Sequence, residues 1–277
     1  MQKLLLGDPV SEYLDNKSSM IFENYEREEG KKATLGAITV GDDPASMLYV
    51  GRKQEKAKIL NVDFHWKKIG ANASIQEVEE SIRELSILNG IILQLPIPSH
   101  LNQDQLVDLI PSELDVDGLN SRNLGTLFDV KPKIIPATAR AIIELFDYYK
   151  IDLSGKDIAV IGRSRLVTAP LARLLSTERY NATVTVLHSK SSNLNFNISK
   201  SDIVISAVGK AYFLNHSNFK EGAIVIDVGI SKKNNKSYGD VDPLNTDEIL
   251  YARSPFPGGV GPITVSALYS NLAKLIS

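Results

Sequence analysis

The sequence predicts a two-domain α/β protein with largely parallel sheets. Strand-like apolar segments alternate with amphipathic helical segments, which is typical of parallel sheets whose strands are connected by helices. The alternation forms two series, one within residues 1–120 and one that starts near Thr138. The chain has 277 residues, enough for two domains that each bury a core.

The first series predicts three strands and three helices. The expected strands lie in 33–40, 62–69 and 90–98, and the expected helices in 46–60, 74–85 and 101–111. We expect Ser46 to cap the first helix, because a serine hydroxyl can accept a hydrogen bond from the first helical turn. The second helix places its apolar residues on one face, namely Ile75, Val78, Ile82 and Leu85.

The second series predicts a doubly wound, Rossmann-like sheet. A helix over about 138–149 precedes four apolar strands within 153–164, 182–190, 201–209 and 221–230. A last helix carries Leu268, Leu272 and Leu275 on one stripe, so we expect it to return to the first domain. The expected domains are therefore 1–120, joined by 263–277, and 121–262.

Composition excludes several classes of function. The net charge of −2 offers no bulk attraction for nucleic acid or an anionic membrane, so neither partner is expected. The absence of cysteine excludes disulfides and thiolate chemistry, and it fits a reducing cytoplasm. No apolar run approaches the roughly 20 residues of a membrane span, and the apolar N-terminal patch is too short for a signal peptide. The four histidines lack metal-ligand spacing, so no metal is expected.

A dinucleotide site is predicted where the second series begins. The full G-x-G-x-x-G pattern is missing, but Gly162-Arg163-Ser164 stands at a strand-to-helix turn. A glycine there lets the backbone approach a phosphate, which the helix N-terminus would bind. The next strand ends in His188-Ser189-Lys190, without the acidic residue usual for NAD. Arg163 nearby could bind a 2′-phosphate, so NADP is the expected cofactor.

Glycines also follow the next two strands, in Val208-Gly209 and Val228-Gly229-Ile230. Because the carboxyl ends of parallel strands share one edge of a sheet, this pattern fits a cofactor that lies across that edge.

Polar residues in the first domain form a second candidate site. Tyr49 and Lys53 share one helix face. Gln94 ends a buried strand, and Asp115 and Asp117 lie in D-V-D-G. Each also has a purely structural interpretation: Gln94 could satisfy backbone groups beside the prolines, and D-V-D-G could be an Asx turn. Y-x-x-x-K is also the catalytic pair of short-chain dehydrogenases, but this pair precedes the nucleotide turn by more than a hundred residues, which argues against that class.

The motifs in combination closely resemble those of the bifunctional methylenetetrahydrofolate dehydrogenase/cyclohydrolase family. They are, in order, Y-V-G-R-K, L-Q-L-P-I-P, D-V-D-G, V-I-G-R-S-R-L-V, H-S-K-S, A-V-G-K, G-A-I-V-I-D-V-G-I, G-D-V and P-F-P-G-G-V-G-P-I-T. The likeness runs from about residue 33 to the C-terminus. It implies NADP-dependent oxidation of methylenetetrahydrofolate to the methenyl cation, followed by hydrolysis to formyltetrahydrofolate.

The resemblance also implies roles for individual residues. Lys53 matches the catalytic lysine, Gln94 the glutamine that orients it, Tyr49 the tyrosine that packs on the folate ring, and Asp117 the carboxylate that holds the pterin edge. The loop that borders the folate corresponds to Pro257, Gly258 and Gly259. The cofactor contacts correspond to Arg163, Ser164, Ser189 and Ile230, beside the Gly162 turn. A homodimer and a cytoplasmic location follow from the same likeness.

The chain departs from the family pattern at three places. Residues 136–141 read P-A-T-A-R-A where the family has P-C-T-P-x-G, Thr168 replaces a glycine, and Leu114 replaces a lysine. Three alternatives remain open on the residues: a mainly monofunctional dehydrogenase, a two-domain NADP enzyme of the amino-acid dehydrogenase type, and a non-catalytic folate- or nucleotide-binding protein.

Overall fold

The computed structural model describes residues 3–129, 132–233, 236–244 and 246–277. The chain forms two compact units. Unit 1 comprises Met1–Ser11 and Thr138–Thr264, and unit 2 comprises Glu12–Ala137 and Val265–Ser277. Two of the three unit boundaries therefore fall inside the long helices α1 (Gly7–Glu29) and α9 (Val260–Ile276), and the third follows the first residue of α6 (Ala137–Tyr149). That residues 1–120 bind folate and residues 121–262 bind the nucleotide stays a proposal.

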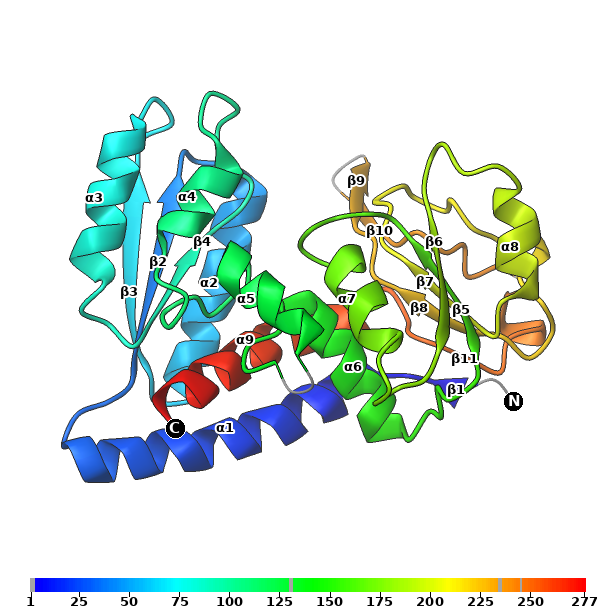
Figure 1. The fold of residues 1–277 in the computed structure, drawn as a ribbon, viewed down its shortest axis with the longest axis horizontal. Coiled ribbons are helices and arrows are strands. Elements are labelled where there is room, and N and C mark those ends of the chain that lie inside the picture. The colour runs from blue at the N-terminus through cyan, green and yellow to red at the C-terminus, as the bar shows by residue number, and fades with distance from the viewer. Residues whose placement is uncertain (1–2, 130–131, 234–235, 245) are drawn as a thin grey trace. The chain divides into compact units, whose positions relative to one another are not determined.

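Unit 2 is built on a three-stranded parallel sheet in the order β3-β2-β4. The strands are β2 (Thr34–Val40), β3 (Asp63–Ile69) and β4 (Gly90–Leu93). The helices are α2 (Pro44–Ile59), α3 (Ile75–Leu85), α4 (Gln103–Leu109) and α5 (Ser121–Gly125), followed by a 3-10 turn, Thr126–Phe128. Figure 1 shows α2 and α3 beside this sheet and α4 next to α3.

Two helix starts in unit 2 show how the sequence sets local structure. The expected Ser46 cap is wrong: Asp43 caps α2, and its carboxylate accepts a 2.7 Å hydrogen bond from the Ser46 amide. The helix begins earlier because Pro44 suits the first helical position, where no amide donor is needed. Ser74 caps α3, in a reciprocal capping box with Glu77.

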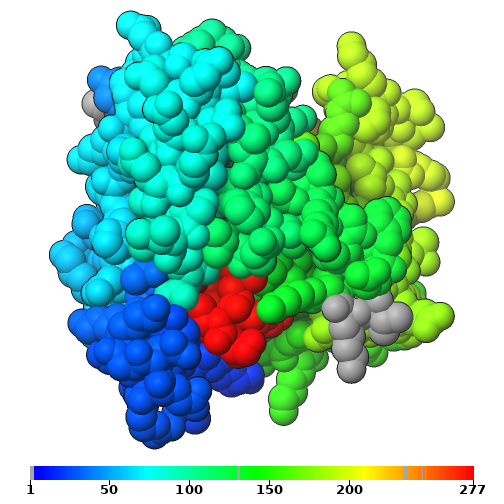
Figure 2. Space-filling view, turned by 60° about the vertical axis from the view of Figure 1, so that its left-hand side comes forward, coloured from blue at the N-terminus to red at the C-terminus, as the bar shows by residue number. Residues whose placement is uncertain are grey.

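The C-terminal helix completes the core of unit 2. Leu268 and Leu272 of the predicted stripe are buried in one cluster with Phe22 of α1 and Leu35 of β2, and Leu275 packs against it. Figure 2 shows the C-terminal residues in red beside the blue surface of α1. The prediction that this helix returns to the first domain is confirmed.

Unit 1 holds a six-stranded sheet in the order β1-β11-β8-β7-β5-β6, and all its pairings are parallel. The four predicted strands are β5 (Asp157–Ile161), β6 (Thr183–Leu187), β7 (Ile203–Ser206) and β8 (Ile224–Asp227). Two further strands, β1 (Lys3–Leu4) and β11 (Ala252–Arg253), lie beyond β8 in this sheet, and each is two residues long. The order β6-β5-β7-β8 is doubly wound, with its switch point between β5 and β7.

The remaining elements of the chain connect or flank these strands. They are the helices α6 (Ala137–Tyr149), α7 (Thr168–Leu175) and α8 (Leu194–Lys200), the antiparallel pair β9 (Ser231–Lys233) and β10 (Lys236–Tyr238), and the 3-10 turns His216–Asn218 and Thr246–Glu248. Within the described part of the chain, no helix has the length and apolar character needed to cross a membrane.

Candidate active site

Lys53 lies at the centre of a polar cluster in unit 2. It projects from α2, and its side chain is only 11% exposed. Its Nζ donates a 3.0 Å hydrogen bond to Oε1 of Gln94. The same Nζ lies 3.8 Å from Oδ2 of Asp117, at ion-pair distance. The structure thus joins three side chains that were singled out on separate segments of the sequence.

Gln94 is held in the orientation that this contact requires. Its backbone amide donates to Ile38 O at 2.8 Å, which continues the pairing of β4 with β2. Its side-chain nitrogen donates to Leu95 O at 2.7 Å. With the amide nitrogen bound in this way, the side-chain oxygen faces the lysine.

The two acids of D-V-D-G differ in environment. Asp115 is buried, and its carboxylate accepts hydrogen bonds from the amides of Gly118 (3.0 Å) and Asn120 (2.8 Å) and from the Asn123 side chain (2.9 Å). Burial raises the pKa of Asp115 to about 6, although these donors oppose the rise. The Asp117 side chain remains 20% exposed. Asp115 therefore shapes the turn, which leaves Asp117 as the acid available to a ligand.

Tyr49 lies one helical turn before Lys53 on α2 and is half-buried. The spacing of four residues puts both side chains on one face of the helix. The Arg52 guanidinium lies 5.8 Å from the centroid of the Tyr49 ring. The Tyr49 ring and the Lys53 ammonium therefore lie on the same face of α2.

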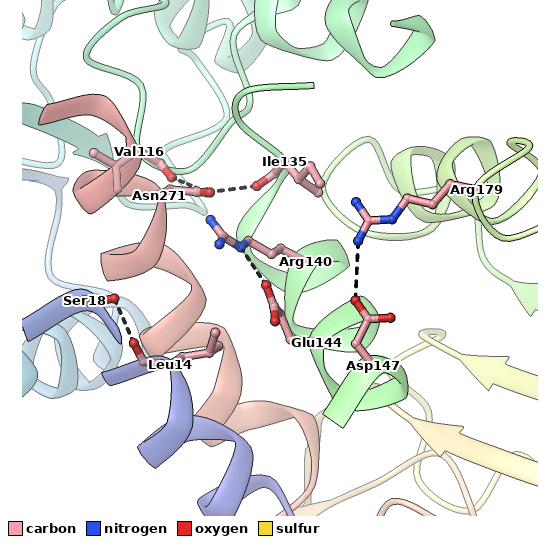
Figure 3. Close-up of polar contacts among 9 residues, drawn as sticks. All are labelled: Leu14, Ser18, Val116, Ile135, Arg140, Glu144, Asp147, Arg179 and Asn271. Carbon is pink, nitrogen blue, oxygen red and sulfur yellow. Dashed lines mark hydrogen bonds and ion pairs between the residues drawn. The ribbon is translucent and has the colours of Figure 1, made fainter. Parts of the chain in front are cut away.

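Two residues of α9 support this cluster and were not predicted to do so. The buried hydroxyl of Tyr269 donates a 2.6 Å hydrogen bond to Lys53 O. The Asn271 side chain donates to Val116 O (2.9 Å) and Ile135 O (2.8 Å), as Figure 3 shows. All three hydrogen bonds join residues more than 130 positions apart in the sequence. No local signal marked them, because α9 carries several other polar residues.

The nucleotide turn of unit 1 has the geometry that a phosphate needs. Gly162 follows β5 with a φ of +130°, a conformation that favours glycine. A Cβ there would lie 3.0 Å from Thr168 Cγ2 and 3.2 Å from Ala207 O. The Thr168 hydroxyl is buried, and no hydrogen-bond partner is described for it. This turn stands at the β5–β7 switch point, the place where doubly wound sheets bind their nucleotides, and it packs closely against Thr168.

The other predicted cofactor residues lie around the same carboxyl edge of the sheet. Arg163 is exposed, and the hydroxyl of Ser164 accepts from the Leu166 amide at 3.1 Å. Ser189 and Ile230 are exposed after β6 and β8. The turn after β6 is fixed by the His188 amide, which donates to the Ser191 hydroxyl at 2.9 Å. This edge carries cations and hydroxyls, which suits a 2′-phosphate.

Pro257, Gly258 and Gly259 belong to unit 1, whereas Lys53 belongs to unit 2. Their loop precedes and enters α9, and Gly258 O accepts a 2.7 Å hydrogen bond from the Gly7 amide. The beginning of α1 therefore fixes this loop.

No cluster of three or more metal-ligating side chains occurs among the residues that the structure describes.

Comparison with known proteins identifies the family of this chain. Residues 5–117 match the tetrahydrofolate dehydrogenase/cyclohydrolase catalytic domain. Residues 136–277 match the NAD(P)-binding domain of the same family.

Similar proteins resemble the chain over nearly its whole length. The bifunctional protein FolD 2 of Lactobacillus johnsonii is 42% identical over 276 residues, which cover 97% of this chain and 95% of that protein. The Campylobacter jejuni FolD crystal structure has a TM-score of 0.94 and 32% identity, covering 100% of this chain and 99% of that one. The Trypanosoma brucei enzyme, solved with NADP and an inhibitor, has a TM-score of 0.94 and 30% identity, covering 99% and 97%. The chain therefore belongs to the tetrahydrofolate dehydrogenase/cyclohydrolase family.

Proposed function

We propose that this chain oxidises methylenetetrahydrofolate with NADP and then hydrolyses the methenyl product to formyltetrahydrofolate. The observation that carries the proposal is the largely buried Lys53 ammonium, hydrogen-bonded to Gln94 and at ion-pair distance from Asp117. Membership of the family supports the same pair of reactions. The similar Campylobacter jejuni protein is named as a bifunctional methylenetetrahydrofolate dehydrogenase/cyclohydrolase.

Hydrolysis is the step for which Lys53 has a clear chemical task. Water adds to the bridging methenyl carbon, a carbon–nitrogen bond of that ring then breaks, and the released nitrogen gains a proton while a second proton goes to solvent. A side chain at this position can relay those protons. Gln94 and Asp117 hold the lysine nitrogen in place, so that it need not be reoriented during the reaction. We propose that Tyr49 packs on the folate ring. Asp117 would bind the pterin edge in addition to holding Lys53.

Oxidation requires less of the side chains. NADP, when bound, accepts the hydride, and the protein holds the reactants. The Gly162 turn, Ser164 and the amides at the start of α7 would bind the phosphates. Arg163 and Ser189 would bind the 2′-phosphate, and Ile230 would border the cofactor. Pro257, Gly258 and Gly259 would form the folate-bordering loop.

We further propose a homodimer in the cytoplasm. The support is the family resemblance together with the absence of cysteine, which fits a reducing compartment. Light scattering should then give about twice the chain mass of 30.4 kDa, and a value near one chain would contradict the dimer.

A paired assay tests the proposed function. NADPH formation from methylenetetrahydrofolate and hydrolysis of methenyltetrahydrofolate are measured separately for wild type and Lys53→Met. We expect wild type to carry out both and the variant to lose hydrolysis first, by roughly 100-fold or more. Lys56→Met is the matched control, because Lys56 lies one turn further along α2 and pairs with Asp15 instead.

Each outcome of this assay has a distinct meaning. If wild type does neither reaction, the folate assignment fails. If wild type only oxidises, the chain is a monofunctional dehydrogenase. If hydrolysis survives Lys53→Met as well as it survives Lys56→Met, the proposed role of Lys53 is wrong.

A further inference from the structure

Asp240 is a buried carboxylate that none of the proposed steps uses. It is 1% exposed, and it lies in unit 1 just after β10. Its Oδ2 accepts hydrogen bonds from the Ser206 hydroxyl and the Val208 amide, both at 2.7 Å. Its Oδ1 accepts from the Lys210 amide at 2.8 Å. One carboxylate therefore binds three donors along the turn that follows β7.

The same carboxylate lies against the end of β8. A Cβ on Gly229 would fall 2.0 Å from Oδ1 of Asp240, so only glycine fits at that position. The amides of Val228 and Gly229 both donate to Ser206 O, at 2.8 and 3.1 Å. The turn after β7 and the turn after β8 are thus bound to each other, with Asp240 between them.

Asp240 is itself held in place by a second buried acid. Asp227, the last residue of β8, accepts hydrogen bonds from the amides of Asp240 (2.9 Å) and Val241 (3.0 Å). The Leu214 amide donates to Asp240 O at 2.9 Å. The backbone of Asp240 is thus fixed on both sides, and its carboxylate has a set position relative to the strands.

These turns adjoin the nucleotide turn. Strand β7 pairs with β5 on one side and β8 on the other. The Ala207 amide donates to Ile161 O at 3.0 Å, one residue before Gly162. In a doubly wound sheet, a dinucleotide lies across the carboxyl ends of the strands. Asp240 therefore fixes two turns of that edge, the one after β7 and the one after β8.

We propose that Asp240 is a cofactor-positioning residue, which holds residues 206–210 and 229–230 in the shape that the dinucleotide binds. The inference rests on the proposed use of NADP at this edge. Asp240 acts through the backbone of the two turns. Its loss therefore weakens cofactor binding while it spares a reaction that uses no cofactor.

The two proposed activities allow this role to be separated from general stability. In Asp240→Asn, one carboxylate oxygen becomes an NH₂ group that faces backbone N–H donors. We expect the NADP dissociation constant, measured by calorimetry, to rise at least tenfold, and the KM for NADP to rise with it. Hydrolysis of methenyltetrahydrofolate, measured without NADP, should stay within about twofold of wild type. Asp242→Asn is the matched control, because the Asp242 carboxylate accepts a hydrogen bond from the Leu244 amide, two residues along the chain.

A milder variant keeps the test decisive if Asp240→Asn does not fold. Ser206→Ala removes the hydroxyl that donates to Oδ2 and leaves the carboxylate in place. We expect its NADP dissociation constant to rise about two- to fivefold, with hydrolysis unchanged. If Ser206→Ala and any folded Asp240→Asn bind NADP as tightly as Asp242→Asn, the positioning role is overturned. A parallel loss of hydrolysis and NADP binding overturns it too. If wild type does not bind NADP, the proposed function itself fails.

Discussion

Replacement of Asn271 by alanine should destabilise unit 2 and disturb the segment that carries Asp117. The side chain is fully buried and donates to two carbonyls, Val116 O at 2.9 Å and Ile135 O at 2.8 Å. Val116 directly precedes Asp117, so this amide fixes the backbone beside a proposed substrate-binding acid. Alanine would leave both carbonyls without this donor.

The size of the effect follows from burial. An unpaired, fully buried polar group costs about 1–3 kcal/mol, and the half-buried Ile135 carbonyl should cost about 1 kcal/mol. The better helix propensity of alanine returns about 0.5 kcal/mol. We therefore expect a loss of about 1.5–3.5 kcal/mol, which lowers the melting temperature by about 3–14 °C.

The control for this prediction is Ser18→Ala on α1. Ser18 is also buried, but its hydroxyl donates to Leu14 O within its own helix, as Figure 3 shows. That carbonyl keeps its helical hydrogen bond when the hydroxyl is removed, so the change should cost less than about 1 kcal/mol. Thermal unfolding of both variants is the assay, with the KM for methenyltetrahydrofolate as a second readout. Equal melting temperatures for the two variants would refute the reasoning.

Two further predictions concern the cofactor and pH. Arg163→Ala should lower the preference for NADP over NAD by at least tenfold, read from the ratio of kcat/KM values; an unchanged ratio would remove Arg163 from the 2′-phosphate site. Burial raises the pKa of Asp115 to about 6, so the folded state binds more protons than the unfolded state between about pH 4 and 6. The contribution of this group to stability is present at low pH and is lost as the pH rises through about 6. In urea unfolding, Asp115→Asn should therefore lower the free energy of unfolding by about 2 kcal/mol more at pH 4.5 than at pH 7. A loss that does not depend on pH would show that Asp115 stays ionised.

The sequence predicted those parts of the fold that leave a periodic pattern. The segments that became β5, β7 and β8 were recognised as continuous apolar runs, and α3 was recognised by its one apolar face. Strands β1 and β11 were missed, since two residues carry no period. The cap of α2 was misplaced because serine and aspartate both cap helices, and a proline at the first helical position decided between them.

The candidate site also contains residues that the sequence predicted and residues that it did not. Lys53, Gln94 and Asp117 could be singled out because each stands at the end of an element or on a marked helix face, and the structure brings them together. Their roles stay proposals. Tyr269 and Asn271 could not be predicted, because their partners lie 216 and 155 or 136 residues away and nothing local encodes the pairing. Asp240 lies in the G-D-V motif, and nothing local encodes its contacts with Ser206, Val208 and Lys210.

The contact of α9 with the rest of unit 2 has a consequence for the order of biosynthesis. The core that receives Leu268 and Leu272 is otherwise made of residues 12–137, and the 127 residues from Thr138 to Thr264 are translated in between. At about 5–20 residues per second, this interval lasts about 6–25 s. Throughout it the apolar surface intended for α9 stays uncovered, and Lys53 lacks the Tyr269 hydrogen bond. Most of the proposed catalytic unit, residues 12–137, is translated before residues 138–264, yet unit 1 is complete first.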